Sequence, residues 1–326
     1  MLNFLKKNWF VSLIVLVFAG FSIFYIYDTN KGKLKGKSVN GEDVVYSIND
    51  EDITISQFYD DLYKSNGSNS IIALFESTVA NAGITTTNEI KDAAEQQASS
   101  IVASFQSQYG SAYEDYLKSA LAETGYTDLV DYLIASEKVN QITADYAKAN
   151  FDDLKIRDIS YILIMFENPG EPADSPTDDE KARMKAVDDA FAAGKEFGEI
   201  ASEFSEDTST ASTGGKLGII DKNSSLDTAF LEAALALQDG EMTSDWIKST
   251  RTDYGYFKII NNASTMATLE NAYLNTNPYL ELVQTNDATL ANKALWAKAQ
   301  ELGVDFNGNE EIEKVIKDYF AVEEGE

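Results

Sequence analysis

The chain of 326 residues contains no cysteine and no histidine. Without cysteine, the sequence excludes disulfide bonds, a thiolate nucleophile and a metal site with cysteine ligands. Without histidine, it lacks the usual general base near neutral pH and the commonest metal ligand. We therefore expect no metal and no cofactor. Any chemistry must use carboxylates, hydroxyl groups, lysine, backbone groups or an apolar pocket.

Basic residues are also scarce, because 26 Lys and Arg stand against 54 Asp and Glu, for a net charge of −28. Such an acidic surface repels nucleic acid, so nucleic-acid binding is not expected. It would attract cationic partners, although adaptation of an exported surface is the simpler explanation. Hydrophobic residues make up 44% of the chain, and its length predicts two or three globular domains.

One uncharged apolar run stands out at residues 9–27. Nineteen residues at ~1.5 Å each span roughly 28 Å, about one hydrocarbon core. A cleaved signal peptide is the alternative, but the apolar run continues beyond its small-residue cleavage site at 17–19. We therefore predict a single-pass protein of the cell membrane with the bulk of the chain on the extracytoplasmic side. Its parts would be a cytoplasmic N-terminus at 1–8, a transmembrane anchor at 9–27 and a tether at 28–42.

Residues 43–150 are expected to form a mainly helical lobe. The stretch VVYSINDEDIT alternates apolar and polar residues, as a short hairpin does. Thr54 and Gln57 then fit a capping box that opens a helix. The pattern that follows, to residue 149, is almost wholly helical. It fits an ordinary α-helical domain and a lobe with a groove for unfolded chain equally well.

The pattern changes near residue 155. The stretch IRDISYILIMF is apolar at nearly every position, which is typical of a strand buried on both faces. Two helical stripes, a Ser/Thr-rich loop, the short strand LGII, a third helix and a hairpin follow. The predicted order is β-α-α-β-α-β-β over residues 156–262. Because residues 266–326 read as helical again, we expect an α+β unit inserted between helical segments that pack together as one lobe.

This element order, with its motifs, resembles the parvulin family of peptidyl-prolyl isomerases. The matching motifs are RDISYILI, EFGEIASEFSEDTSTASTGGKLGII, AFLEAALALQDGEMTS and TDYGYFKII. The flanking segments look like the helical chaperone parts of membrane-anchored extracellular foldases of the PrsA type. The resemblance implies an α+β fold with a parvulin (FKBP-like) domain at 155–263, between chaperone segments at 43–150 and 266–326. It also implies, as partners, unfolded or partly folded exported proteins with X-Pro segments, the membrane, and a second copy in a homodimer.

The resemblance also implies which residues form the site. Asp207 fills the central acidic or cysteine position, and Tyr161 follows the serine of the first strand, so these two are the expected catalytic residues. Tyr161 and Phe257 stand where parvulins commonly carry histidine. Asp207 could instead cap a turn, and the aromatic residues could instead belong to the core. The expected substrate-binding residues are Leu217, Leu226, Phe230 and Phe257.

Prolyl isomerisation breaks no bond and requires no proton transfer, so the missing histidines do not exclude it. It requires an apolar pocket for the prolyl ring and an environment that stabilises the twisted amide. The expected function is therefore that of a membrane-anchored foldase that combines peptidyl-prolyl isomerisation with chaperone binding. The alternative is a weak or inactive parvulin-like holdase that only binds unfolded chains. A solute-binding surface protein has little support in the sequence.

Overall fold

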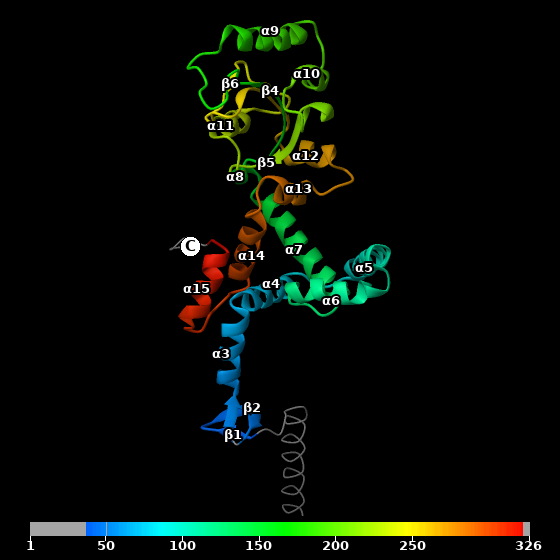
Figure 1. Ribbon diagram of the computed structural model, residues 1–326, viewed down its shortest axis with the longest axis vertical. Helices are drawn as coiled ribbons and strands as arrows, with labels where there is room; N and C mark the ends of the chain where they lie inside the picture. The colour runs from blue at the N-terminus through cyan, green and yellow to red at the C-terminus, as the bar shows by residue number, and fades with distance from the viewer. Residues whose placement is uncertain (1–36, 50, 322–326) are drawn as a thin grey trace, which may run out of the picture. The chain divides into compact units, whose positions relative to one another are not determined.

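The structure is a computed structural model that describes residues 37–49 and 51–321 and divides into two units. The first unit ends at Ser68. In it, an antiparallel sheet of β1 (Ser38–Val39), β2 (Glu42–Ile48) and β3 (Glu51–Thr54) precedes helix α3 (Ile55–Asn66) (Figure 1). Thr54 and Gln57 form a reciprocal capping box at the start of α3, which confirms the predicted helix start.

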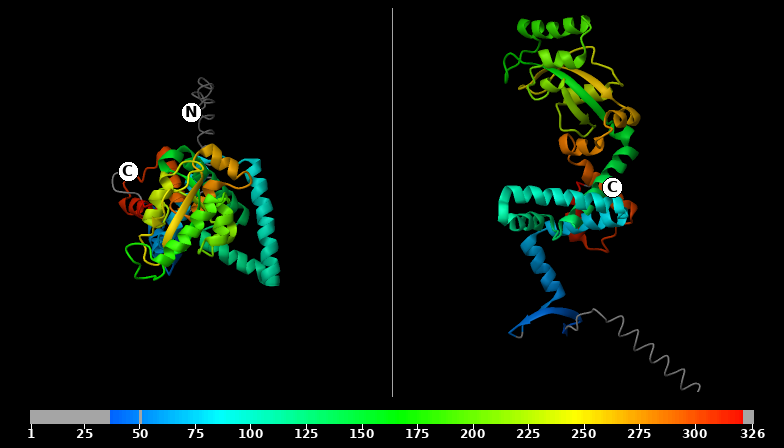
Figure 2. Two further views of the ribbon diagram at one scale, coloured as in Figure 1. Left: turned by 90° about the horizontal axis from the view of Figure 1, so that it is seen from above. Right: turned by 90° about the vertical axis from the view of Figure 1, so that its right-hand side faces the viewer.

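The second unit begins at Asn69 and contains a helical part built from both ends of its sequence. A buried cluster joins α4, α7, α14 and α15 through residues such as Ile72, Ile142, Leu295 and Ile316. Helices α5 and α6 contact each other near the turn that joins them, and in the view from above they diverge from it at an angle (Figure 2). The helices of this part are α4 (Asn69–Gly83), α5 (Asn88–Tyr109), α6 (Tyr113–Thr124), α7 (Leu129–Ala149), α14 (Leu290–Glu301) and α15 (Glu310–Tyr319), with a short 3-10 turn at Gly110–Ala112.

Between these helices the chain forms an α+β domain, which confirms the predicted fold class and element order. Its strands form one antiparallel sheet in the order β5-β4-β7-β6. Its elements are β4 (Arg157–Met165), α9 (Asp178–Ala192), α10 (Phe197–Phe204), a 3-10 turn at Ala211–Thr213, β5 (Lys216–Ile220), α11 (Thr228–Ala236), β6 (Ile247–Lys248) and β7 (Gly255–Ala263).

Strand β4 is buried on both faces, as its largely apolar sequence predicts. Ile162 and Ile164 pack against α9 and α10, whereas Ile159 and Leu163 face the opposite side and pack with α11. Successive side chains of a strand point to opposite faces, which explains this division. The sheet therefore lies between the α9–α10 pair and α11 (Figure 1).

Short helices connect the α+β domain to the helical part: α8 (Phe151–Leu154), α12 (Met266–Ala272) and α13 (Pro278–Thr285). They share one buried cluster with the end of α7 and with Ile219 of β5. The side-chain amide of Asn286 donates a hydrogen bond of 2.7 Å to the carbonyl oxygen of Ile219. The sheet is thus attached to the helices at its β5 edge.

The predicted location in the cell membrane is corrected by the structure. Within residues 37–49 and 51–321, no helix combines the length and the apolar composition that a membrane crossing requires. The segment predicted to be the anchor, residues 9–27, lies outside the described residues. The prediction of a single-pass protein with its bulk on the extracytoplasmic side is therefore withdrawn.

Candidate functional site

Three aromatic rings meet on the α11 side of the sheet. Tyr161 comes from β4, Phe257 from the neighbouring strand β7, and Phe230 from the first turn of α11. Their ring centroids lie 5.0 to 5.9 Å apart, at interplanar angles of 73° to 83°. Edge-to-face contacts of this kind are the favoured packing of aromatic side chains. The rings form an apolar floor of the type that a prolyl ring requires.

Half-buried side chains surround this floor. Leu217 of β5 and Leu226, just before α11, pack against the same cluster as Phe230 and Phe257. Phe230 and Phe257 are each only 3% exposed, so a ligand meets mainly the more accessible side chains around them. The structure thus brings all four predicted substrate-binding residues together with Tyr161, and their roles toward a ligand stay predictions.

The loop after α10 brings Asp207 to the edge of the aromatic cluster. The Tyr161 hydroxyl donates a hydrogen bond to Asp207 Oδ2, and the Thr210 hydroxyl donates to the same oxygen at 2.6 Å. The other oxygen, Oδ1, accepts from the backbone N–H of Ser209 at 3.0 Å and from its hydroxyl at 2.7 Å. Four donors thus occupy the roughly four lone-pair positions of an ionised carboxylate.

These hydrogen bonds determine the charge state of the pair. Burial opposes ionisation of Asp207, but the hydrogen bonds from Thr210, Tyr161 and Ser209 outweigh it and hold the pKa of Asp207 below its ordinary value. Burial and the hydrogen bond to Asp207 raise the pKa of Tyr161. Near neutral pH, Asp207 is therefore ionised, and Tyr161 keeps the proton that it donates to Asp207.

Two glycines shape this loop. Gly214 and Gly215 have φ values of +72° and +77°, a region that other residues rarely adopt. A Cβ atom on Gly215 would lie 2.2 Å from the carbonyl oxygen of Tyr161. This close approach allows the N–H of Tyr161 to donate a 2.9 Å hydrogen bond to the carbonyl oxygen of Gly215. The loop is therefore attached directly to the strand that carries Tyr161.

Sequence reasoning missed two residues that shape the site. Tyr254 packs against the cluster, with its ring centroid 5.9 Å from that of Phe257 and the two ring planes tilted by 50°. Asp227 caps α11 by accepting from the N–H of Phe230 at 3.0 Å, and it also accepts from the N–H of Thr250 at 2.8 Å. An Asp directly before an apolar helix is an N-cap signal, so Asp227 was accessible from the sequence. Its link to residue 250 was not, because no local pattern encodes it.

The arrangement offers apolar and hydrogen-bonding chemistry. Among residues 37–49 and 51–321, no group of three or more acidic side chains is placed to hold a metal ion. The carboxylate of Asp207 accepts hydrogen bonds on both oxygens, and the phenol of Tyr161 links it to the rings of Phe230 and Phe257. Such a site can bind an apolar ring and present an electron-rich oxygen beside it.

The family model for Rotamase, described as a PPIC-type PPIASE domain, matches residues 162–261, the part of the chain that carries this site. Foldase protein PrsA 1 of Lactobacillus johnsonii is 26% identical over 262 residues, which cover 78% of this chain and 77% of that protein. Foldase protein PrsA of Staphylococcus aureus is 32% identical over 226 residues, which cover 65% and 66%, respectively. A solved structure of the peptidylprolyl isomerase PrsA from Bacillus cereus aligns with a TM-score of 0.40 at 16% identity, over 86% of this chain and 98% of that chain. The family-model match and the PrsA relatives identify the chain as a parvulin-type, PrsA-like foldase with a peptidyl-prolyl isomerase domain.

Proposed function

We propose that prolyl isomerisation takes place on the Tyr161–Phe230–Phe257 floor, with Asp207 acting through Tyr161. The observation that supports this most strongly is the hydrogen bond that the Tyr161 hydroxyl donates to Asp207 at the edge of the floor. This hydrogen bond places a negative charge behind the phenol. The substrates would be X-Pro segments of unfolded or partly folded proteins.

The mechanism follows from the electronic structure of the amide. Resonance places partial negative charge on the carbonyl oxygen and creates a rotation barrier of ~18–20 kcal/mol. Because Tyr161 donates its proton to Asp207, its oxygen offers only lone pairs to a bound peptide. A substrate carbonyl held beside that oxygen is disfavoured in its charged resonance form. The apolar floor also removes water that would stabilise this form, so both effects lower the barrier.

The test is the cis/trans exchange rate of a short X-Pro peptide, measured by NMR with the full-length protein. We expect the parent to accelerate exchange and Tyr161→Phe and Asp207→Asn to lose about tenfold, equivalent to ~1.4 kcal/mol of barrier. Tyr256→Phe is the matched control. It deletes the hydroxyl of a buried tyrosine on the opposite face of the sheet, and that hydroxyl has no hydrogen-bond partner among the described residues.

Two outcomes would contradict the proposed site. Equal losses in Tyr256→Phe and Tyr161→Phe would show that any missing hydroxyl in the sheet has the same effect. An exchange rate for the parent equal to the uncatalysed rate, with suppression of client aggregation retained, would favour the holdase alternative. The absence of both family histidines is the observation that favours that alternative. Homodimerisation and the domain boundaries stay predictions.

A further inference from the structure

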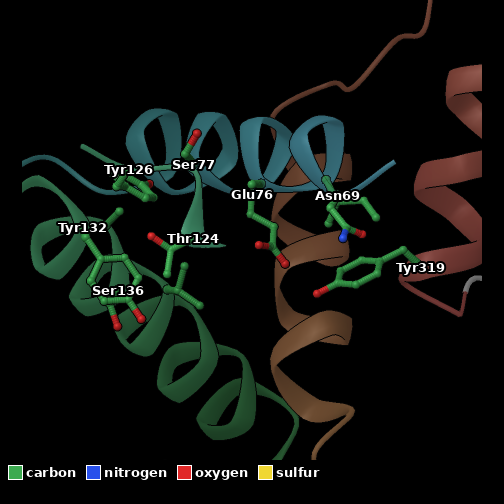
Figure 3. Close-up of a pocket in the computed structure, with 12 residues that line it drawn as sticks. Asn69, Glu76, Ser77, Thr124, Tyr126, Tyr132, Ser136 and Tyr319 are labelled. Carbon is green, nitrogen blue, oxygen red and sulfur yellow. The ribbon is translucent and has the colours of Figure 1, made fainter. Parts of the chain in front are cut away.

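A cavity lies in the helical part of the second unit, outside the isomerase domain. Its volume is about 340 Å³, and residues of α4, α7 and α15 and of the segment 124–126 line it. Figure 3 shows the Glu76 side chain descending from α4 into the middle of this cavity, with the hydroxyl of Tyr319 directed toward its carboxylate. Tyr126 and Tyr132 form the opposite wall, with their rings edge to face at 5.6 Å.

Glu76 lacks a cationic partner in this cavity. Burial raises the pKa of Glu76, and the hydrogen bond from Tyr319 only partly opposes the rise. Among the described residues that line the cavity, none is a lysine or arginine. Lys138, on the adjoining helix α7, donates instead to Asn81 Oδ1 at 2.6 Å. A ligand that brings a positive charge stabilises the ionised form of a carboxylate in these surroundings.

The walls suit the rest of a cationic side chain. Three tyrosine rings line the cavity, and aromatic faces attract ammonium and guanidinium groups. Ile72, Ala73 and Val139 add apolar surface, against which the methylene stem of a lysine or arginine can pack. An anionic ligand would meet Glu76 and a net charge of −28, so the chemistry favours a cation.

A second feature of α4 indicates that the cation is part of a polypeptide. Another side of this helix borders an apolar groove of about 480 Å³, which Leu74, Phe75, Leu302 and Phe306 help to line. Leu74 is 68% exposed and Leu302 is 45% exposed, so both can receive a partner's apolar side chain. An extended chain crossing α4 could place a basic residue beside Glu76 and an apolar residue in this groove.

We propose that the Glu76 cavity binds the lysine or arginine side chain of an extended client segment, whose nearby apolar residue occupies the groove on α4. This proposal rests on the proposed function in one respect: it takes the occupant to be a client protein of the foldase. If the exchange assay on a short X-Pro peptide showed no catalysis, the peptide-binding comparison described below would still give a result. The two proposals are therefore tested independently.

The test compares two fluorescent peptides binding to the full-length protein, followed by anisotropy. One peptide contains an arginine and a leucine a few residues apart. The other carries citrulline, the neutral isostere of arginine, at the same position. We expect the arginine peptide to bind about tenfold more tightly, because a charge-assisted contact to Glu76 and the cation–π contacts are both lost with citrulline. Equal affinities would overturn the proposal without any variant of the protein.

Glu76→Gln identifies the cavity as the source of the preference. Glutamine keeps an acceptor for the Tyr319 hydroxyl and removes the charge, so the preference for arginine should fall from about tenfold to less than about threefold. Glu95→Gln makes the same charge change at an exposed position of α5 and should leave the preference unchanged. A preference that survives Glu76→Gln, or falls equally in both variants, would overturn the proposal.

Ethylguanidinium separates a client side chain from a free small cation. If the cavity serves a polypeptide, this ion should displace the arginine peptide only at concentrations far above the dissociation constant of the peptide, because it makes no contact with the groove on α4. Displacement at concentrations comparable to that constant would show a small-cation site and overturn the assignment to clients.

Discussion

Asp207 and Glu76 are two partly buried carboxylates in the same unit, and their surroundings move their pKa values in opposite directions. Burial raises both pKa values. At Asp207, donors from Tyr161, Thr210 and Ser209 more than compensate for the burial, whereas Glu76 has Tyr319 alone as its hydrogen-bonding partner in the cavity. Asp207 has more donors and is less deeply buried than Glu76, so the balance between donors and burial decides which carboxylate is ionised at little cost.

This difference separates two kinds of site. The carboxylate at residue 207 accepts hydrogen bonds on both oxygens from its own chain, and in the proposed mechanism it acts on a ligand through Tyr161. At residue 76 the hydrogen bond from Tyr319 does not offset the cost of burying the charge, so a cation supplied by a partner would stabilise this carboxylate. The predictions below test this contrast from its largest expected effect to its smallest.

Gly215→Ala should have the largest effect, because it separates the Asp207 loop from Tyr161. The new Cβ would lie 2.2 Å from a backbone oxygen at a φ of +77°, and we expect a loss of about 3 kcal/mol in the free energy of unfolding. Gly194→Ala is the control, since its φ is +81° but nothing lies within 4 Å of the added atom. It should lose about 1 kcal/mol. Urea denaturation measures both, and similar losses would contradict the close approach.

Asp207→Asn should lower stability by about 2 kcal/mol at neutral pH, because it weakens charge-assisted hydrogen bonds. The folded-state pKa of Asp207 is depressed, so its contribution is present above the unfolded-state value of about 3.9 and is lost as the pH falls through the folded-state value. The stability difference from the parent should therefore be constant above about pH 5 and shrink in stronger acid. A stability difference between parent and variant that grows on acidification would contradict the conclusion that the hydrogen bonds to Asp207 lower its pKa.

Glu76→Gln should act in the opposite direction and more weakly. The raised folded-state pKa means that ionisation of Glu76 costs stability near neutral pH. The variant should therefore be more stable than the parent by about 0.5 kcal/mol at pH 7, a small value because the side chain is partly exposed. The advantage should vanish below the unfolded-state pKa of about 4.3. Thermal unfolding at pH 7 and pH 4 measures this stability difference. A variant less stable than the parent at pH 7 would mean that groups of the protein already stabilise the charge of Glu76.

The pH profile of catalysis should show the smallest effect, namely none. The chain has no histidine, the pKa of Asp207 is lowered and that of Tyr161 is raised. Neither site group changes its charge between about pH 5.5 and pH 8. The isomerisation rate should therefore be constant over this range once the uncatalysed rate is subtracted. A sigmoidal profile would point to another titrating group at the site.

Much of the fold was predictable because its signals are local. The capping box at Thr177 and Glu180 marks the start of α9, and both of its hydrogen bonds are present. The apolar run from Tyr161 to Ile164 predicts a strand buried on both faces, as observed. The predicted membrane location could not be upheld in the same way, because it depended on residues 9–27, which lie outside the described part of the chain.

The site was predictable only in part. Motif resemblance named Asp207, Tyr161 and four apolar residues, and the structure gathers all of them around one floor. No sequence pattern indicates that Thr210 and Ser209 saturate Asp207, because which carboxylate oxygen each donor reaches depends on how the loop turns. The contact between Tyr319 and Glu76 joins residues far apart in the chain, so periodicity could not reveal that cavity.

The sequence by itself determined which chemistry this protein can use. With neither histidine nor cysteine, its chemistry must come from carboxylates, hydroxyl groups, lysine, backbone groups or apolar side chains. Only the tertiary structure decided that the pKa of Asp207 is lowered and that of Glu76 is raised. The free energy of a buried charge depends on the number and direction of the donors around it, and those donors come from segments that meet only when the chain folds.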